Sequence, residues 1–209
     1  MNLDTNALGD ASEPLQGLPQ WARASTELRD YYLREWGVPV TSETGVFERL
    51  SLEVFQAGLS WATILRKRDA FREVFAGFEP DAVAALTDAD VTRLMSDSRI
   101  VRNRRKIEAT VANARATIAL REHDSLPTLV LQHAPGTRLA ASKEAEIPTR
   151  TECSAALANT LRTHGFRMVG PTNMYALMCA IGPVNAHLVS SHRYPVVERM
   201  QLRALEAAT

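Results

Sequence analysis

Apolar residues recur every three or four positions along much of the chain, which is the spacing that places them on one face of an α-helix. Two such runs lie on either side of Gly58. They contain Val46, Phe47, Leu50, Val54 and Ala57, and then Trp61, Ile64, Leu65, Phe71 and Phe75. Glycine adopts the left-handed conformation that ends many helices, and Ser60 is of a type that caps the next one. The pattern therefore predicts two helices joined by a tight corner.

The same periodicity predicts further helices. They cover residues 26–36, 81–86, 88–95, about 107–118, 151–164, 172–181, 184–191 and 196–208. Thr26 and Thr151 are placed to cap two of them, and Thr87 with Asp90 has the spacing of a capping box. Residues 123–143 show no clear pattern, and no segment alternates convincingly between apolar and polar residues as a half-buried strand does. The predicted fold class is all-α.

Length and composition fit one domain, because 209 residues, of which 45% are hydrophobic, can fill a sizeable core. We predict a flexible N-terminal arm over residues 1–17, a single domain over 18–195 and a helical C-terminal extension over 196–209. No apolar run reaches the roughly 20 residues of a membrane span, and no secretory signal is recognisable. Cys153 and Cys179 form no disulfide or zinc spacing. A cytoplasmic location is therefore expected.

Glu53, Gln56 and Trp61 lie at the predicted corner. Glu53 falls at the margin of the apolar stripe and not opposite it. A carboxylate in such a position is usually solvated, and a tryptophan at helical spacing usually belongs to the core. A carboxylate, an amide and an indole at one corner can also hold a flat heterocycle by hydrogen bonding and stacking. Periodicity alone leaves both interpretations open.

Positive charge gathers over residues 97–107, although the formal net charge of the chain is +0. A short helix, a tight turn with two apolar residues and a basic helix start describe a helix–hairpin–helix. Backbone N–H groups and flanking cations at such a turn bind phosphate. The cations are Arg99, Arg102, Arg104, Arg105 and Lys106. Such a cluster is also compatible with a solvated surface.

Several motifs, in order, resemble the DNA-3-methyladenine glycosylase I (Tag) family from about residue 21 to about 195. They are Tyr31-Tyr32, Glu35-Trp36-Gly37-Val38-Pro39, Leu52-Glu53, Gln56-Ala57-Gly58-Leu59-Ser60-Trp61, Arg102-Asn103-Arg104, Lys106-Ile107, Asn113-Ala114-Arg115-Ala116, Glu146-Ile147-Pro148-Thr149, Gly165-Phe166, Val169-Gly170 and Val184-Asn185-Ala186-His187. The resemblance implies a helix–hairpin–helix DNA glycosylase fold, with a small lobe formed by the N- and C-terminal segments.

The resemblance also implies a function, which is to extrude 3-methyladenine from alkylated double-stranded DNA and to hydrolyse its glycosidic bond as a monomer without a cofactor. Glu53 is the expected catalytic residue, because a carboxylate favours the positively charged methylated base. The expected base-binding residues are Trp21, Tyr31, Trp36, Gln56 and Trp61. Gly58 and Leu59 are expected to contact DNA, with Leu59 as a wedge in the duplex, together with the five cations of residues 97–107.

The chain departs from the family pattern at the hairpin, where the family has glycine at about the positions of Arg99 and Arg105. This departure favours an alternative function, that of a catalytically inactive helix–hairpin–helix DNA-binding protein. The intact set of pocket residues argues against that alternative. A glycosylase for another damaged base is a second alternative.

A further departure concerns metal. Members of the family commonly hold a zinc ion with two cysteines and two histidines, and the matching residues here are Pro19, Tyr32, His187 and Ser191. One usual ligand cannot form a four-coordinate structural zinc site. We therefore expect no metal, with Tyr32 packed at this position and His187 hydrogen-bonded.

Overall fold

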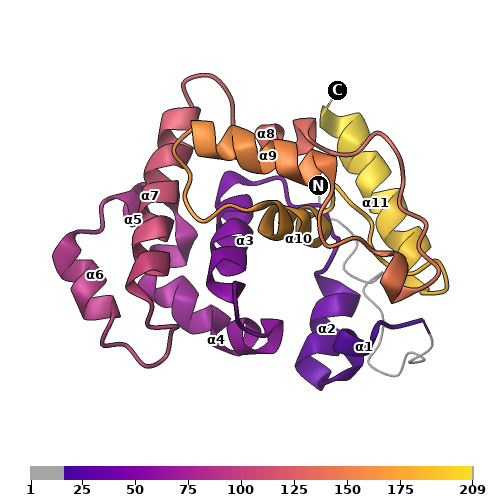
Figure 1. Cartoon of the computed structure of the whole chain (residues 1–209), viewed down its shortest axis with the longest axis horizontal. Helices are drawn as coiled ribbons and strands as arrows, with labels where there is room; N and C mark the ends of the chain where they lie inside the picture. Colours follow the sequence, from indigo (N-terminus) through magenta and orange to yellow (C-terminus); the bar gives the residue numbers. More distant parts are fainter. Residues whose placement is uncertain (1–16, 209) are drawn as a thin grey trace. The chain divides into compact units, whose positions relative to one another are not determined.

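The computed structural model describes residues 17–208, and within that range it contains helices and no β-strand (Figure 1). The α-helices are α1 (Gln20–Arg23), α2 (Thr26–Arg34), α3 (Glu43–Gln56), α4 (Trp61–Val74), α5 (Pro80–Ala84), α6 (Asp88–Leu94), α7 (Arg104–Leu120), α8 (Leu126–Gln132), α9 (Glu152–Thr163), α10 (Pro171–Ile181) and α11 (Arg193–Ala208). The 3₁₀ turns η2 (Ala76–Phe78) and η3 (Glu144–Glu146) complete the set. None of these helices combines the length and apolar character needed to cross a membrane. The all-α prediction is confirmed.

The residues form two compact units, and each is described by itself. Unit 1 contains residues up to Pro39, residues 135–148 and residues from Met178 onward. Unit 2 contains residues 40–134 and 149–177, and so includes α3 to α9 and the first part of α10. Most of the predicted N-terminal arm lies outside the described residues. The predicted boundaries of a single domain and of a C-terminal extension remain predictions.

Unit 2 is built around α3 and α7. Helix α7 packs against α3, α5 and α6, and α3 also contacts α4 and α8. Phenylalanine rings fill the space beside α3 and α4: the Phe55 and Phe71 ring centroids are 4.4 Å apart, and Phe75 and Phe78 stack at 5.5 Å. All four side chains are fully buried. This core fixes the end of α3, where the predicted corner lies.

Unit 1 gathers its own core around α1 and α2. The buried members are Leu18, Ala22, Tyr32 and Leu33, and Trp21 and Trp36 pack against them. The amide of Gly37 donates to the carbonyl of Ala180, which ties the segment after α2 to the end of α10 within this unit.

Three local predictions are wrong. Ser25, not Thr26, caps α2, because its hydroxyl accepts the amide of Leu28 at 3.2 Å. Residues 123–143 contain a helix, α8, whose proline stands in the first turn, where no amide partner is needed. Residues 184–191 are not helical. The chain leaves α10 through Gly182 at φ +106°, and the side chain of Asn185 then accepts the backbone amide of His187.

Candidate base-binding site and DNA-contacting hairpin

The corner between α3 and α4, defined here as residues 56–61, has the predicted construction. Gly58 has φ +80°, and no atom lies within 4 Å of the position of an added Cβ, so backbone conformation and not crowding requires glycine there. The hydroxyl of Ser60 accepts the amide of Thr63 and caps α4. The amide of Leu59 donates to the Gln56 carbonyl. Gln56 and Trp61 are therefore held on one short, fixed corner.

Glu53 lies one turn before that corner and is buried, with 6% of its surface exposed. No residue in the described part of the chain forms a hydrogen bond or ion pair with its carboxyl group. Burial raises the pKa of Glu53 to about 8, and the positive charge of Arg49 lowers it only in part. The side chain is therefore a buried acid to which the described residues offer no hydrogen-bond or ion-pair partner, in contrast to the solvated carboxylate that is usual at such positions. A cationic ligand would provide the missing partner.

The remaining predicted pocket residues lie in unit 1. The Trp21 and Trp36 rings meet edge to face with centroids 5.4 Å apart, and both indoles are partly exposed. Tyr31 is buried, with its ring centroid 6.4 Å from that of Trp21. The predicted site residues therefore form two groups. The three aromatic residues lie together in unit 1, and Glu53 lies with the corner in unit 2.

The hairpin loop, defined here as residues 95–103, joins α6 to α7. Its apolar Ile100 is buried, and the side chain of Asn103 caps α7 by accepting the amide of Lys106. Neither Arg99 nor Arg105 has a positive φ, and Arg105 lies within the first turn of α7. The turn therefore forms without left-handed backbone at the two positions where the family has glycine.

The five predicted DNA-contacting cations differ in environment. Arg102 and Arg105 are exposed and form no hydrogen bond or ion pair with any described residue. Arg99 is paired with Asp97 at 2.8 Å and with Glu73 at 2.7 Å. Arg104 lies 3.5 Å from Glu108. Arg102 and Arg105 are consequently the two cations most available to phosphate.

Lys106 is a correction to the predicted DNA-contacting set. Its side chain is buried, and its ammonium donates to the carbonyls of Phe55 at 2.7 Å and Ala57 at 2.6 Å. A side chain held in this way cannot reach a phosphate outside the protein. The sequence suggests DNA contact because Lys106 stands beside exposed arginines, but the helical turn that exposes Arg105 directs Lys106 to the interior.

The residues at the family's zinc position do not fit a zinc ion. The Tyr32 hydroxyl donates to the Ser191 hydroxyl at 3.1 Å, and Nδ1 of His187 lies 2.9 Å from the Asn185 amide oxygen. The imidazole packs against Tyr32 and Trp36 with centroid distances of 4.7 and 4.8 Å. Burial lowers the pKa of His187 to about 3, and the Arg193 charge adds to that effect. This set offers one usual zinc ligand, and no described group of three or more histidine, cysteine or acidic residues could hold a metal.

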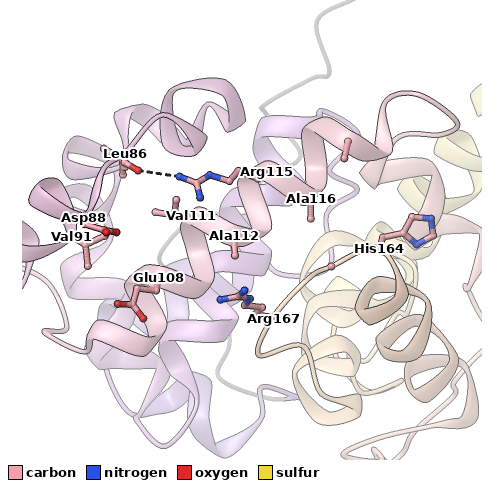
Figure 2. Close-up of a pocket in the computed structure, with 12 residues that line it drawn as sticks. Leu86, Asp88, Val91, Glu108, Val111, Ala112, Arg115, Ala116, His164 and Arg167 are labelled. Carbon is pink, nitrogen blue, oxygen red and sulfur yellow. Dashed lines mark hydrogen bonds between the residues drawn. The ribbon is translucent and has the colours of Figure 1, made fainter.

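A cavity of about 540 Å³ lies elsewhere in unit 2, between α6, α7 and the end of α9 (Figure 2). Arg115 spans one side of it and donates to the carbonyls of Ala84 and Leu86. Its wall also contains Glu108, Arg167 and His164. None of the predicted catalytic or base-binding residues lines this cavity, so we do not assign it to the base.

A buried acid beside a corner with an exposed leucine, and a basic hairpin, in described residues that are helical without strands, are what the resemblance to the class of DNA glycosylases that take a base out of the duplex implies. Comparison with known proteins supports this class. The methyladenine glycosylase family model matches residues 21–194, close to the range expected from the sequence. The chain belongs to this family.

Relatives and solved structures fit that membership. The chain is 42% identical to DNA-3-methyladenine glycosylase 1 of Escherichia coli over 170 residues, or 79% of this chain and 90% of that protein. It is similar to a crystal structure of 3-methyladenine DNA glycosylase I, with TM-score 0.80 and 39% identity over 83% of this chain and 97% of that one. A structure of 3-methyladenine DNA glycosylase I from Staphylococcus aureus, which gives the structural basis of 3-methyladenine recognition by that protein, has TM-score 0.78 and 31% identity over 82% of this chain and 93% of that one.

Proposed function

We propose that the protein is a DNA repair enzyme that excises 3-methyladenine from alkylated double-stranded DNA by hydrolysing the N-glycosidic bond. Membership of the methyladenine glycosylase family supports this function. The structural observation that carries it is the buried carboxyl group of Glu53, which has no partner among the described residues. Methylation gives the base a positive charge, and a positive charge next to Glu53 favours the carboxylate form.

In this proposal the enzyme mainly selects and extrudes the base. Methylation already weakens the glycosidic bond, so less chemistry is required than for a neutral base. Glu53 accepts a charge-assisted hydrogen bond from the base. The partly exposed indole of Trp61, in the same unit, supplies a face for stacking and cation–π attraction of on the order of 1–2 kcal/mol when desolvated. Leu59, 42% exposed at the corner, can enter the gap that the extruded base leaves.

Three accompanying proposals concern how the enzyme works. It acts without zinc, because hydrogen bonds between Tyr32 and Ser191 and between His187 and Asn185 take the place of a metal at the family's zinc position. It acts as a monomer. It is located in the cytoplasm, where it reaches DNA without crossing a membrane.

A panel of alkylated DNA tests the function. Purified protein is incubated with duplexes that carry 3-methyladenine or other methylated bases, and the released bases are separated by chromatography. We expect release of 3-methyladenine in preference to the others. Release of a different base would make the protein a glycosylase for other damage, and binding of duplex without release would make it a DNA-binding protein.

A further inference from the structure

Lys106 links the start of the hairpin helix α7 to the end of α3. Its ammonium donates to the carbonyls of Phe55 and Ala57, which stand where α3 ends and the corner begins. The last carbonyls of a helix lack partners within it, and positive charge is favoured at that end. Lys106 therefore satisfies two carbonyl groups that the corner leaves open.

Lys67 makes the converse link. It comes from α4, on the other side of the corner, and its ammonium donates to the carbonyls of Ser98 at 3.0 Å and Arg99 at 2.9 Å in the hairpin loop. The hairpin helix thus reaches the corner, and the helix after the corner reaches the hairpin loop. Four charge-assisted hydrogen bonds, all within unit 2, join the two segments.

The joined segments have different tasks in the proposed function. The hairpin side presents Arg102 and Arg105 to the DNA backbone, and the corner presents Leu59 and Gln56 to the lesion. Backbone contacts fix the register of a protein on a duplex. These backbone contacts determine where Leu59 enters the duplex only if the distance between the hairpin and the corner is fixed. A displacement of about 1 Å is enough to impair a reaction that depends on orientation.

We propose that Lys106 and Lys67 are positioning residues that hold the corner in register with the hairpin, so that a duplex bound at the hairpin places its damaged base at the corner, where Leu59 enters the duplex and Glu53 meets the base. This inference rests on the proposed function. Neither lysine touches the base in this account. Both act through the backbone carbonyls that they hold.

The test replaces each lysine by methionine, which keeps the apolar stem and removes the ammonium. Single-turnover excision from duplex DNA carrying 3-methyladenine is compared with binding of free 3-methyladenine, followed by tryptophan fluorescence. For Lys106→Met and Lys67→Met we expect excision to fall about tenfold or more, while free-base affinity changes by less than about twofold. Lys67→Arg keeps the donors and should recover most of the excision.

Arg115 provides a matched control. It lies on α7, like Lys106, and also donates to two backbone carbonyls, but these belong to Ala84 and Leu86 and not to the corner or the hairpin loop; Figure 2 shows the bond to Leu86. Arg115→Met should lower the melting temperature and leave excision by the folded protein near the wild-type value. If Lys106→Met fails to fold, the more exposed Lys67 decides the question.

The outcomes separate this inference from the function on which it rests. Wild-type protein that releases no 3-methyladenine overturns both. An active wild type with equally active lysine variants overturns the positioning role alone. The positioning role is also overturned if Arg115→Met loses as much excision as the lysine variants. It is overturned as well if the lysine variants lose free-base affinity by the same factor as excision. Either outcome indicates a general loss of structure.

Discussion

Glu53 and His187 are both buried titratable groups, but their surroundings differ. Nδ1 of His187 is hydrogen-bonded to Asn185 and the ring packs against two aromatic rings, while Nε2 is buried with no hydrogen-bond partner among the described residues. Burial lowers the pKa of His187 to about 3, so the ring is neutral. Glu53 has no comparable partner among the described residues, and burial raises its pKa to about 8. One ring nitrogen of His187 is thus hydrogen-bonded inside the fold, whereas the carboxyl group of Glu53 has no hydrogen bond to any described residue, and a buried polar group without one destabilises a fold. The contrast indicates that His187 serves structure and Glu53 serves a ligand.

The largest expected effect comes from removing the charge of Glu53. Glu53→Gln keeps the shape of the side chain and loses a charge-assisted hydrogen bond, which contributes roughly 1.5–3 kcal/mol, or about ten- to a hundredfold in rate. We expect that loss in single-turnover excision, with the circular dichroism spectrum unchanged. An excision rate close to that of the wild type would remove Glu53 from the catalytic site.

The pH dependence of excision should follow the raised pKa of Glu53. Since kcat/KM reports the ionisation of the free enzyme, we expect it to rise by about tenfold per pH unit below pH 8 and to level off above. Glu53→Gln should lack this rise. A wild-type profile that is flat between pH 6 and pH 8 would show that ionisation of Glu53 does not limit activity.

Stability should show the opposite trend with pH. A carboxyl group whose pKa is raised from 4.5 to about 8 in the folded state binds its proton more tightly there than in the unfolded chain. Stability is therefore greatest below pH 4.5 with respect to this group and falls as pH rises through 8. At pH 9, Glu53→Gln should exceed the wild type in free energy of unfolding by on the order of 2 kcal/mol or more. Denaturant titrations at pH 6 and pH 9 measure the difference.

The hairpin shows the same contrast on a smaller scale, since Arg99 is paired with Asp97 and Arg102 forms no ion pair with any described residue. Arg102→Ala or Arg105→Ala should weaken binding to damaged and undamaged duplexes alike and reduce the slope of log affinity against log salt by about one. Arg99→Ala should change that slope less. Equal changes for all three would show that the ion pairs of Arg99 do not restrain it from DNA.

The smallest effects are expected at the residues that stand at the family's zinc position, Tyr32, His187 and Ser191. Tyr32→Phe removes one buried hydrogen bond to Ser191 and should lower the free energy of unfolding by about 1 kcal/mol. Chelator should leave the melting temperature unchanged, and elemental analysis should find no stoichiometric zinc. Tightly bound zinc whose removal lowers the melting temperature would show that the ligands are other residues.

Local rules account for the parts of the structure that the sequence predicts. The capping box of Thr87 and Asp90, the cap at Ser60 and the left-handed Gly58 depend on residues within four positions of one another. The failed helix over residues 184–191 has the right periodicity, but the side chain of Asn185 competes for backbone groups.

Tertiary contacts account for what the sequence does not predict. Lys106 has the same charge as its exposed neighbour Arg105, and only the packing of α7 on α3 shows that it faces inward. Lys67 carries no local signal of its link to the hairpin loop, which is 31 residues away. The burial of Glu53 follows from packing as well, since its place on the helix left a solvated position open.

That Glu53 is a buried acid which gains a partner only from a cationic base is tested most directly by a carbon-13 NMR titration of its carboxyl group in the unliganded protein. Glu53→Gln assigns the resonance. We expect a pKa near 8, far above the ordinary value of 4.5. A pKa near 4.5 would contradict this expectation, because the Glu53 carboxylate would then be stabilised by water and would not require a cationic base as its partner.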